Sequence, residues 1–166
     1  MSISSGVSFN ECLHADLKLH GDITHVLLLF RHHQVAFVTD IKMMYRQTLV
    51  RPDDRQYQLL FWRESPSDEL VTYELNINTC RLKSSPYIAI RSLFELAEWE
   101  CHRYLRAAEI IRLNVYVDDV LSGGSSLEDA QSLQTELLEL IGVGGYELQK
   151  WLSNCSELLA VVPHEY

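Results

Sequence analysis

The 166-residue sequence is poor in cysteine pairs, flexible linkers and long apolar runs. Its cysteines stand far apart and form no C-x-x-C pair, so we interpret Cys12, Cys80, Cys101 and Cys155 as free intracellular thiols and not as a zinc site. No apolar run approaches the roughly 20 residues that cross a bilayer. The N-terminus lacks the basic and apolar regions of a secretory signal. We therefore expect an intracellular protein, cytoplasmic or nuclear, that is not secreted and has no membrane partner.

Basic residues are also scarce, because 14 Lys and Arg face 23 Asp and Glu, which gives a net charge of −9. Nucleic-acid binding proteins obtain much of their affinity from cationic contacts to phosphates, so this balance argues against a stand-alone nucleic-acid binder. It remains compatible with an acidic catalytic core whose basic flanking parts lie elsewhere. Hydrophobic residues make up 47% and charged residues 22%, which is typical of one globular domain.

The spacing of apolar residues predicts helices over 23–33, 85–102 and 127–141, and strands over 34–41, 56–62, 70–77 and 146–152. A further strand, turn and strand are expected after Ala107. Asp22 is a candidate helix cap, Ser84-Ser85-Pro86 has the pattern of a helix start with a hydroxyl cap followed by proline, and Ser125 with Glu128 forms a capping-box pattern. Residues 1–20 and the tail give no firm signal. This order predicts an α+β fold, a mostly antiparallel sheet with helices on one face.

Two adjacent acids, Asp118 and Asp119, interrupt the apolar stretch LNVYVDDVLSGG at 113–124. On a regular strand one of two neighbours would face the core unpaired, so we expect a tight turn at 116–119 with both carboxylates at its tip. Closely spaced carboxylates repel each other and usually persist where a divalent cation neutralises them. A solvated turn between two strands explains the same pair equally well.

A third acid, Asp40, ends the predicted strand 34–41. Strand ends are favoured ligand sites in α/β sheets, although an acid there can instead cap the following helix. If this strand neighbours the hairpin, the carboxylates of Asp40, Asp118 and Asp119 meet at one sheet edge. Such a cluster can hold two Mg²⁺ ions about 3.5–4 Å apart for phosphoryl transfer. The pair His32–His33 is a weaker candidate for a metal role.

Four blocks follow one another along the chain: VAFVTDIKMMY (35–45), LKSSPYIAIR (82–91), NVYVDDVLSG (114–123) and GGYELQKW (144–151). In this order they resemble the palm domain of reverse transcriptases, most closely those of Pao/BEL-type LTR retrotransposons. The resemblance implies a polymerase palm-like fold in one globular unit over 34–166, after a partial fingers segment over 1–33, with no thumb. It also implies RNA-directed DNA polymerase activity on an RNA or DNA template-primer with deoxynucleoside triphosphates, supported by two Mg²⁺ ions or by Mn²⁺.

The resemblance further implies catalytic roles for single residues. Asp40, Asp118 and Asp119 match the metal-binding carboxylates of the family. Lys150 matches a lysine proposed to donate a proton to the departing pyrophosphate. An exposed strand lysine with no catalytic role also explains Lys150.

The other matched residues lie at substrate-binding positions. Ile41 matches a position that contributes a backbone carbonyl, and Tyr45 matches the steric gate that excludes a 2′-hydroxyl, although core packing also explains this ring. Tyr116 matches the aromatic residue beside the primer end. The start of the helix that lies against template and nucleotide is matched by Ser84, Ser85 and Pro86.

Two departures from the family pattern affect the expected activity. Cys80-Arg81 stand where the family has an aromatic residue or glutamine followed by glycine; glycine lets the backbone approach the nucleotide, and Arg81 would fill or re-aim that space. The family's basic triphosphate grip, thumb, connection and ribonuclease H parts have no counterpart in the matched blocks. We therefore expect an incomplete, inactive fragment of a retrotransposon polyprotein. The alternatives are a non-catalytic domesticated remnant that binds protein or RNA, and a metal-dependent nuclease that uses the same acids.

Overall fold

The computed structural model describes residues 6–14, 17–160 and 162 of the chain. It contains two compact units, a smaller one formed by Met1–Leu17 with Tyr45–Ala89 and a larger one formed by Lys18–Met44 with Ile90–Tyr166. The division at residue 33 that the resemblance implies stays a prediction. Within the described ranges, no helix combines the length and the apolar character that a membrane crossing requires.

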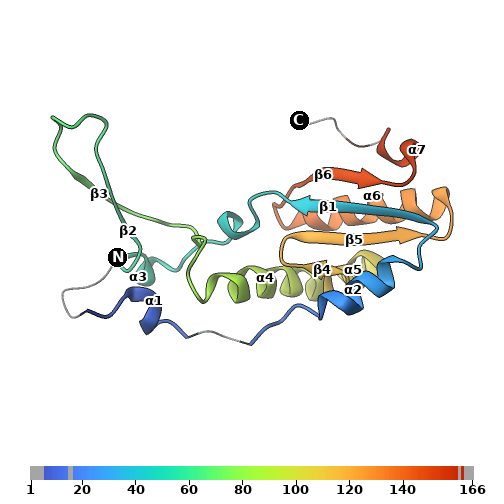
Figure 1. Ribbon diagram of the computed structural model, residues 1–166, viewed down its shortest axis with the longest axis horizontal. Helices are drawn as coiled ribbons and strands as arrows, with labels where there is room; N and C mark the ends of the chain where they lie inside the picture. The colour runs from blue at the N-terminus through green and yellow to red at the C-terminus, as the bar shows by residue number, and fades with distance from the viewer. Residues whose placement is uncertain (1–5, 15–16, 161, 163–166) are drawn as a thin grey trace. The chain divides into compact units, whose positions relative to one another are not determined.

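The larger unit is built on a four-stranded antiparallel sheet in the order β4-β5-β1-β6 (Figure 1). Its strands are β1 (Val35–Ile41), β4 (Val115–Tyr116), β5 (Asp119–Gly124) and β6 (Leu148–Ser153). The helices are α2 (Ile23–Phe30), α5 (Leu105–Leu113), α6 (Leu127–Val143) and α7 (Ser156–Leu159). Helices α5 and α6 pack against each other and against β5, and α6 runs behind the sheet in the view of Figure 1. The expected α+β class with an antiparallel sheet is confirmed.

The core of the larger unit lies between this sheet and its helices. Successive side chains of β1 point to opposite faces of the sheet. Phe37, Thr39 and Ile41 are buried on one face, and Asp40 belongs to the other face. On α6 the buried side chains recur at helical spacing, and they include Leu133, Leu137, Leu140 and Ile141. Strands β1 and β5 approach so closely at Gly123 that a Cβ there would lie 2.3 Å from the Val35 carbonyl oxygen. The start of β1 is therefore packed tightly against the end of β5.

The smaller unit contains short elements around one hairpin. The strands β2 (Leu59–Trp62) and β3 (Val71–Glu74) pair in antiparallel fashion, which confirms the expected hairpin over a shorter range. The helices are α1 (Phe9–Cys12) and α3 (Pro52–Arg55). The 3-10 helix η1 (Met44–Gln47) and the long helix α4 (Ser85–Trp99) each contain a boundary between the two units.

Some sequence-based expectations about the elements are wrong. The stretch after Ala107 begins as the helix α5, not as a strand, because Ala107, Ala108 and Ile111 form a buried helical face. Helix α6 is capped one residue later than expected, since the Ser126 side chain, and not that of Ser125, accepts from the Asp129 amide. Helix α2 has the expected cap but already ends at Phe30. The helices α1, α3 and α7 were not expected.

Candidate metal centre at the turn between strands β4 and β5

The turn that joins β4 to β5 carries the adjacent acids. Tyr116 pairs with Asp119, so Val117 and Asp118 are the two central residues of a tight hairpin, as expected. Val117 has φ 61, and a positive φ at the first central position is typical of type II′ turns, which favour glycine there. A β-branched residue in this conformation is strained by about 1–3 kcal/mol, and such residues cluster at functional sites.

Strand β1 brings Asp40 to this turn. Asp40 lies directly opposite Asp119 in the β1–β5 ladder, and the amide of Ile41 donates to the Asp118 carbonyl oxygen at 2.8 Å. One oxygen from each of Asp40, Asp118 and Asp119 can be chosen so that all three atoms lie within 4.8 Å of one another. The expected meeting of these acids is confirmed. In the part of the chain that the structure describes, no other group of three or more His, Cys, Asp or Glu side chains is placed to share a cation.

The electrostatics of the cluster match its geometry. The pKa of Asp119 is raised above its ordinary value, first because the carboxyl is partly buried, and then because Asp118 and Asp40 add negative charge. Lys150 opposes this rise in pKa. Carboxylate oxygens are the ligands that hard divalent cations such as Mg²⁺ prefer, so the donor set fits such an ion.

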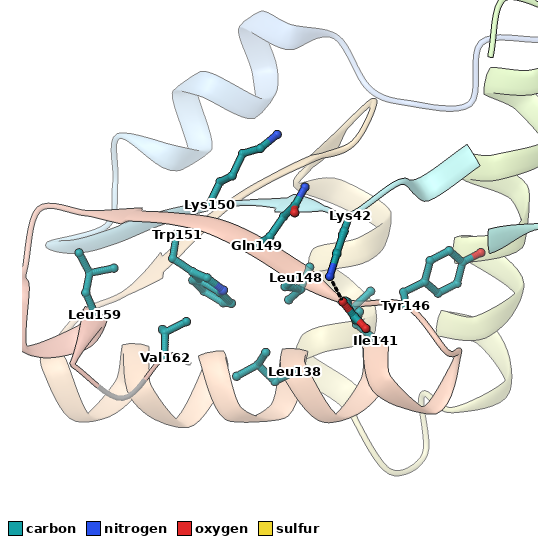
Figure 2. A pocket seen from close by; sticks show the side chains of 11 residues that line it. Lys42, Leu138, Ile141, Tyr146, Leu148, Gln149, Lys150, Trp151, Leu159 and Val162 are labelled. Carbon is teal, nitrogen blue, oxygen red and sulfur yellow. Dashed lines mark hydrogen bonds and ion pairs between the residues drawn. The ribbon is translucent and has the colours of Figure 1, made fainter. Parts of the chain in front are cut away.

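Two residues of β6 contact the carboxylate of Asp40. Gln149 Nε2 donates to Asp40 Oδ1 at 2.5 Å, and Lys150 Nζ lies 3.3 Å from Asp40 Oδ2. Figure 2 shows the side chains of Gln149 and Lys150 on the same side of β6, whereas Trp151 points to the other side, towards α6. Lys150 was expected at this site from the resemblance. Gln149 was not.

Tyr116 stands at the end of β4, beside the acids. Its ring is half-buried, and the ring of His20 meets it edge-on with centroids 4.8 Å apart. Behind the turn, the buried Asn114 donates from Nδ2 to the Leu121 carbonyl oxygen at 3.1 Å and ties the start of the hairpin to β5. Neither His20 nor Asn114 was identified from the sequence.

A separate cavity of about 540 Å³ lies between β6 and the helices α6 and α7 (Figure 2). Apolar side chains such as Leu138, Trp151 and Leu159 line it, together with the ion pair of Lys42 and Glu147 at 2.6 Å. None of the acids Asp40, Asp118 and Asp119 belongs to its lining. The lining does include Gln149 and Lys150, so the cavity and the acid cluster share these two residues of β6.

The remaining expected site residues belong to the smaller unit, and they are Tyr45, Arg81, Ser84, Ser85 and Pro86. Tyr45 is half-buried in η1. Ser84 is half-buried and Pro86 is exposed. Ser85 is fully buried, and its hydroxyl lies 2.7 Å from Asn78 Oδ1 and 2.5 Å from the Thr79 carbonyl oxygen. Its side chain thus holds the start of α4 and does not face solvent.

Arg81 has an unusual backbone. It is exposed, with φ 75, and its carbonyl oxygen accepts from Asn10 Nδ2 at 3.0 Å. This φ lies in the left-handed region, where glycine is favoured. Arg81 therefore keeps the conformation that a glycine would adopt at this position.

Comparison with known proteins adds no assignment: no protein-family model and no curated protein matches the chain.

Proposed function

We propose that the larger unit is the palm of an RNA-directed DNA polymerase, a reverse transcriptase of the Pao/BEL retrotransposon type. The observation that carries the proposal is the meeting of Asp40, Asp118 and Asp119 at the strained turn between β4 and β5. The second support is the order of the four sequence blocks, two of which contain these acids, because it is the order of the reverse-transcriptase palm.

In this proposal the three aspartates bind divalent cations. Two magnesium ions bound there would activate the primer 3′-hydroxyl and stabilise the leaving pyrophosphate. Phosphoryl transfer depends mainly on positioning and charge neutralisation, so the protein needs no nucleophile of its own. The backbone hydrogen bond from Ile41 to Asp118 keeps the end of β1 in register with the turn and so keeps the carboxylates together.

Other residues of the larger unit act on the substrates. The ring of Tyr116, at the end of β4, would contact the primer terminus. Lys150 is available as a proton donor to pyrophosphate, because its side chain is 70% exposed and its ammonium group already lies beside Asp40. For the smaller unit, the resemblance assigns exclusion of a 2′-hydroxyl to Tyr45 and contacts with template and nucleotide to the segment 84–86, in which the buried Ser85 has the structural role described above.

The test is the addition of a single nucleotide. A labelled DNA primer on an RNA template is incubated with the protein, Mn²⁺ and one deoxynucleoside triphosphate at a time. Polymerase chemistry at the acid cluster would give a product one nucleotide longer only with the triphosphate complementary to the next template base, whereas the inactive fragment expected from the resemblance would give no product.

Two variants control this experiment. Asp118→Asn should abolish the addition, because it removes one carboxylate of the cluster. Asp22→Asn removes the same charge elsewhere in the larger unit and should not affect the addition, since asparagine can replace aspartate as the cap of α2. Metal-dependent shortening of the primer would instead indicate a nuclease. Absence of any metal-dependent reaction or metal binding would favour a non-catalytic remnant.

A further inference from the structure

The strand β6 is irregular at the point where it passes Asp40. Val38 pairs with Leu152, but Asp40 pairs with Gln149, so β6 has one extra residue between these two pairs. Lys150 lies in this interval and has φ 53. An extra residue with a left-handed backbone is typical of a β-bulge, which redirects the side chains around it.

The bulge places two consecutive side chains on one carboxylate. In a regular strand Gln149 and Lys150 would point to opposite faces, and only one of them could reach Asp40. Here both point to the same side of β6 (Figure 2), and each bonds a different oxygen of Asp40. Both oxygens of Asp40 are thus already bonded within the protein.

The two partners of Asp40 are held very differently. The Gln149 backbone carbonyl accepts from Thr39 Oγ1 at 2.9 Å, and the Gln149 side chain is half-buried. Beyond the bulge, the ring of Trp151 packs on the buried Phe37 with centroids 5.4 Å apart, which fixes the strand from its other face. The side chain of Lys150, in contrast, is 70% exposed.

We propose that Gln149 is a positioning residue for the metal centre. Its side-chain amide stays hydrogen-bonded to Oδ1 of Asp40 and thereby orients this carboxylate towards Asp118 and Asp119. The ammonium group of Lys150 moves away from Oδ2 of Asp40 when a divalent cation binds. The proposal rests on the proposed function, because it requires a cation at the acid cluster. An ammonium group and a divalent cation repel each other at one carboxylate. The neutral amide can stay, since a carboxylate oxygen has lone pairs for both a donor and a metal.

The first test compares Mn²⁺ affinities by isothermal titration of the 166-residue chain. Gln149→Met removes the amide but keeps the length of the side chain. Because partners that orient metal ligands usually contribute about 10–100-fold to affinity, Gln149→Met should weaken Mn²⁺ binding by that factor. The matched control is Gln131→Met on α6, whose side chain has no hydrogen bond among the described residues, and its affinity should equal that of wild type. Lys150→Met should bind Mn²⁺ more tightly than wild type, because it removes a competing cation.

A second readout separates positioning from general loss of structure. Terbium ions replace Mn²⁺ at oxygen sites, and their luminescence lifetimes in H₂O and D₂O give the number of bound water molecules. If Asp40 turns away in Gln149→Met, about one additional water should take its place on the ion. If Gln149→Met does not fold, Gln149→Asn serves instead, since it keeps an amide in the strand that is too short to reach Asp40.

The outcomes distinguish the two proposals. If wild type binds no Mn²⁺, the metal centre and the role of Gln149 both fail. If wild type binds Mn²⁺ and both Gln149 variants match it in affinity and in water number, only the positioning role is overturned. The inference is supported if the Gln149 variants, and not the Gln131→Met control, bind Mn²⁺ more weakly and carry an additional water on the ion.

Discussion

Replacing Asp119 by asparagine should stabilise the protein when no metal is present. Asp119 lies directly opposite Asp40 in the β1–β5 ladder and next to Asp118 in the chain. Its pKa is raised by partial burial and by the charges of both neighbours, so its ionised form is less stable in the folded protein than in the unfolded chain. Asp119→Asn removes this ionised group and keeps the shape of the side chain.

The sign of the pH dependence follows from the raised pKa. Below the ordinary pKa of 3.8, Asp119 is protonated in both the folded and the unfolded protein, so it does not lower the free energy of unfolding. The cost develops as the pH rises from 3.8 to the raised pKa of the folded state, and it is complete above that pKa. The gain from Asp119→Asn is therefore larger at pH 7 than in acid, where it vanishes.

The size of the gain follows from the position of the carboxylates. Like charges directly opposite each other on neighbouring strands cost about 0.2–1 kcal/mol, and solvent screening of the exposed Asp119 keeps the value within that range. For a protein of this size about 1 kcal/mol corresponds to about 2–4 °C in Tm. We expect a rise of about 0.4–4 °C in EDTA at pH 7.

Thermal unfolding followed by circular dichroism measures this gain. The control is Glu139→Gln, which removes an exposed acid on α6 that has no charged partner among the described residues. Mn²⁺ should raise the Tm of wild type more than that of Asp119→Asn, because a ligand stabilises the state that binds it. A fall in Tm for Asp119→Asn in EDTA, or an equal rise at pH 3, would refute the reasoning.

Four further substitutions test other parts of the structure. Arg81→Gly should raise the free energy of unfolding by about 1 kcal/mol, because Arg81 has φ 75, a conformation that glycine adopts without strain. The control Arg51→Gly should lower the free energy of unfolding, because Arg51 has φ −54 and is not strained. Urea unfolding measures both changes. Gly123→Ala should destabilise by at least about 1–3 kcal/mol in the same assay, because its Cβ would collide with the Val35 carbonyl oxygen. The pKa of Asp129 is lowered by hydrogen bonds from Ser125 and then by Arg106, so Asp129→Asn should lower Tm at pH 7, and the difference from wild type should narrow as the pH falls below 3.8. Equal Tm differences at pH 7 and pH 2.5 would contradict this account of Asp129.

The strands that carry the acid cluster were predictable because their signals are local. The short apolar run over 35–38 placed Asp40 at a strand end, and the need to avoid a buried unpaired acid placed Asp118 at a turn. Helix α5 was not predicted, because Ile110 and Ile111 lead directly into the β-branched residues of the hairpin. The helix formers Leu105 to Ala108 were the available signal against a strand there.

The role of Gln149 could not be predicted from strand periodicity. Alternation assigns Gln149 and Lys150 to opposite faces, and only the bulge places both beside Asp40. No glycine or asparagine marks this bulge, since the left-handed residue is Lys150 itself. The positive φ of Val117 could not be predicted either, because the hairpin imposes it against the conformational preference of valine.

The central claim is that Asp40, Asp118 and Asp119 together bind divalent cations. Anomalous diffraction from crystals of the protein grown with Mn²⁺ tests it most directly. We predict anomalous density bonded to oxygens of all three carboxylates, with Gln149 still on Asp40 and Lys150 displaced from it. Manganese bound elsewhere, with Lys150 still paired to Asp40 and no density among the three aspartates, would contradict the account.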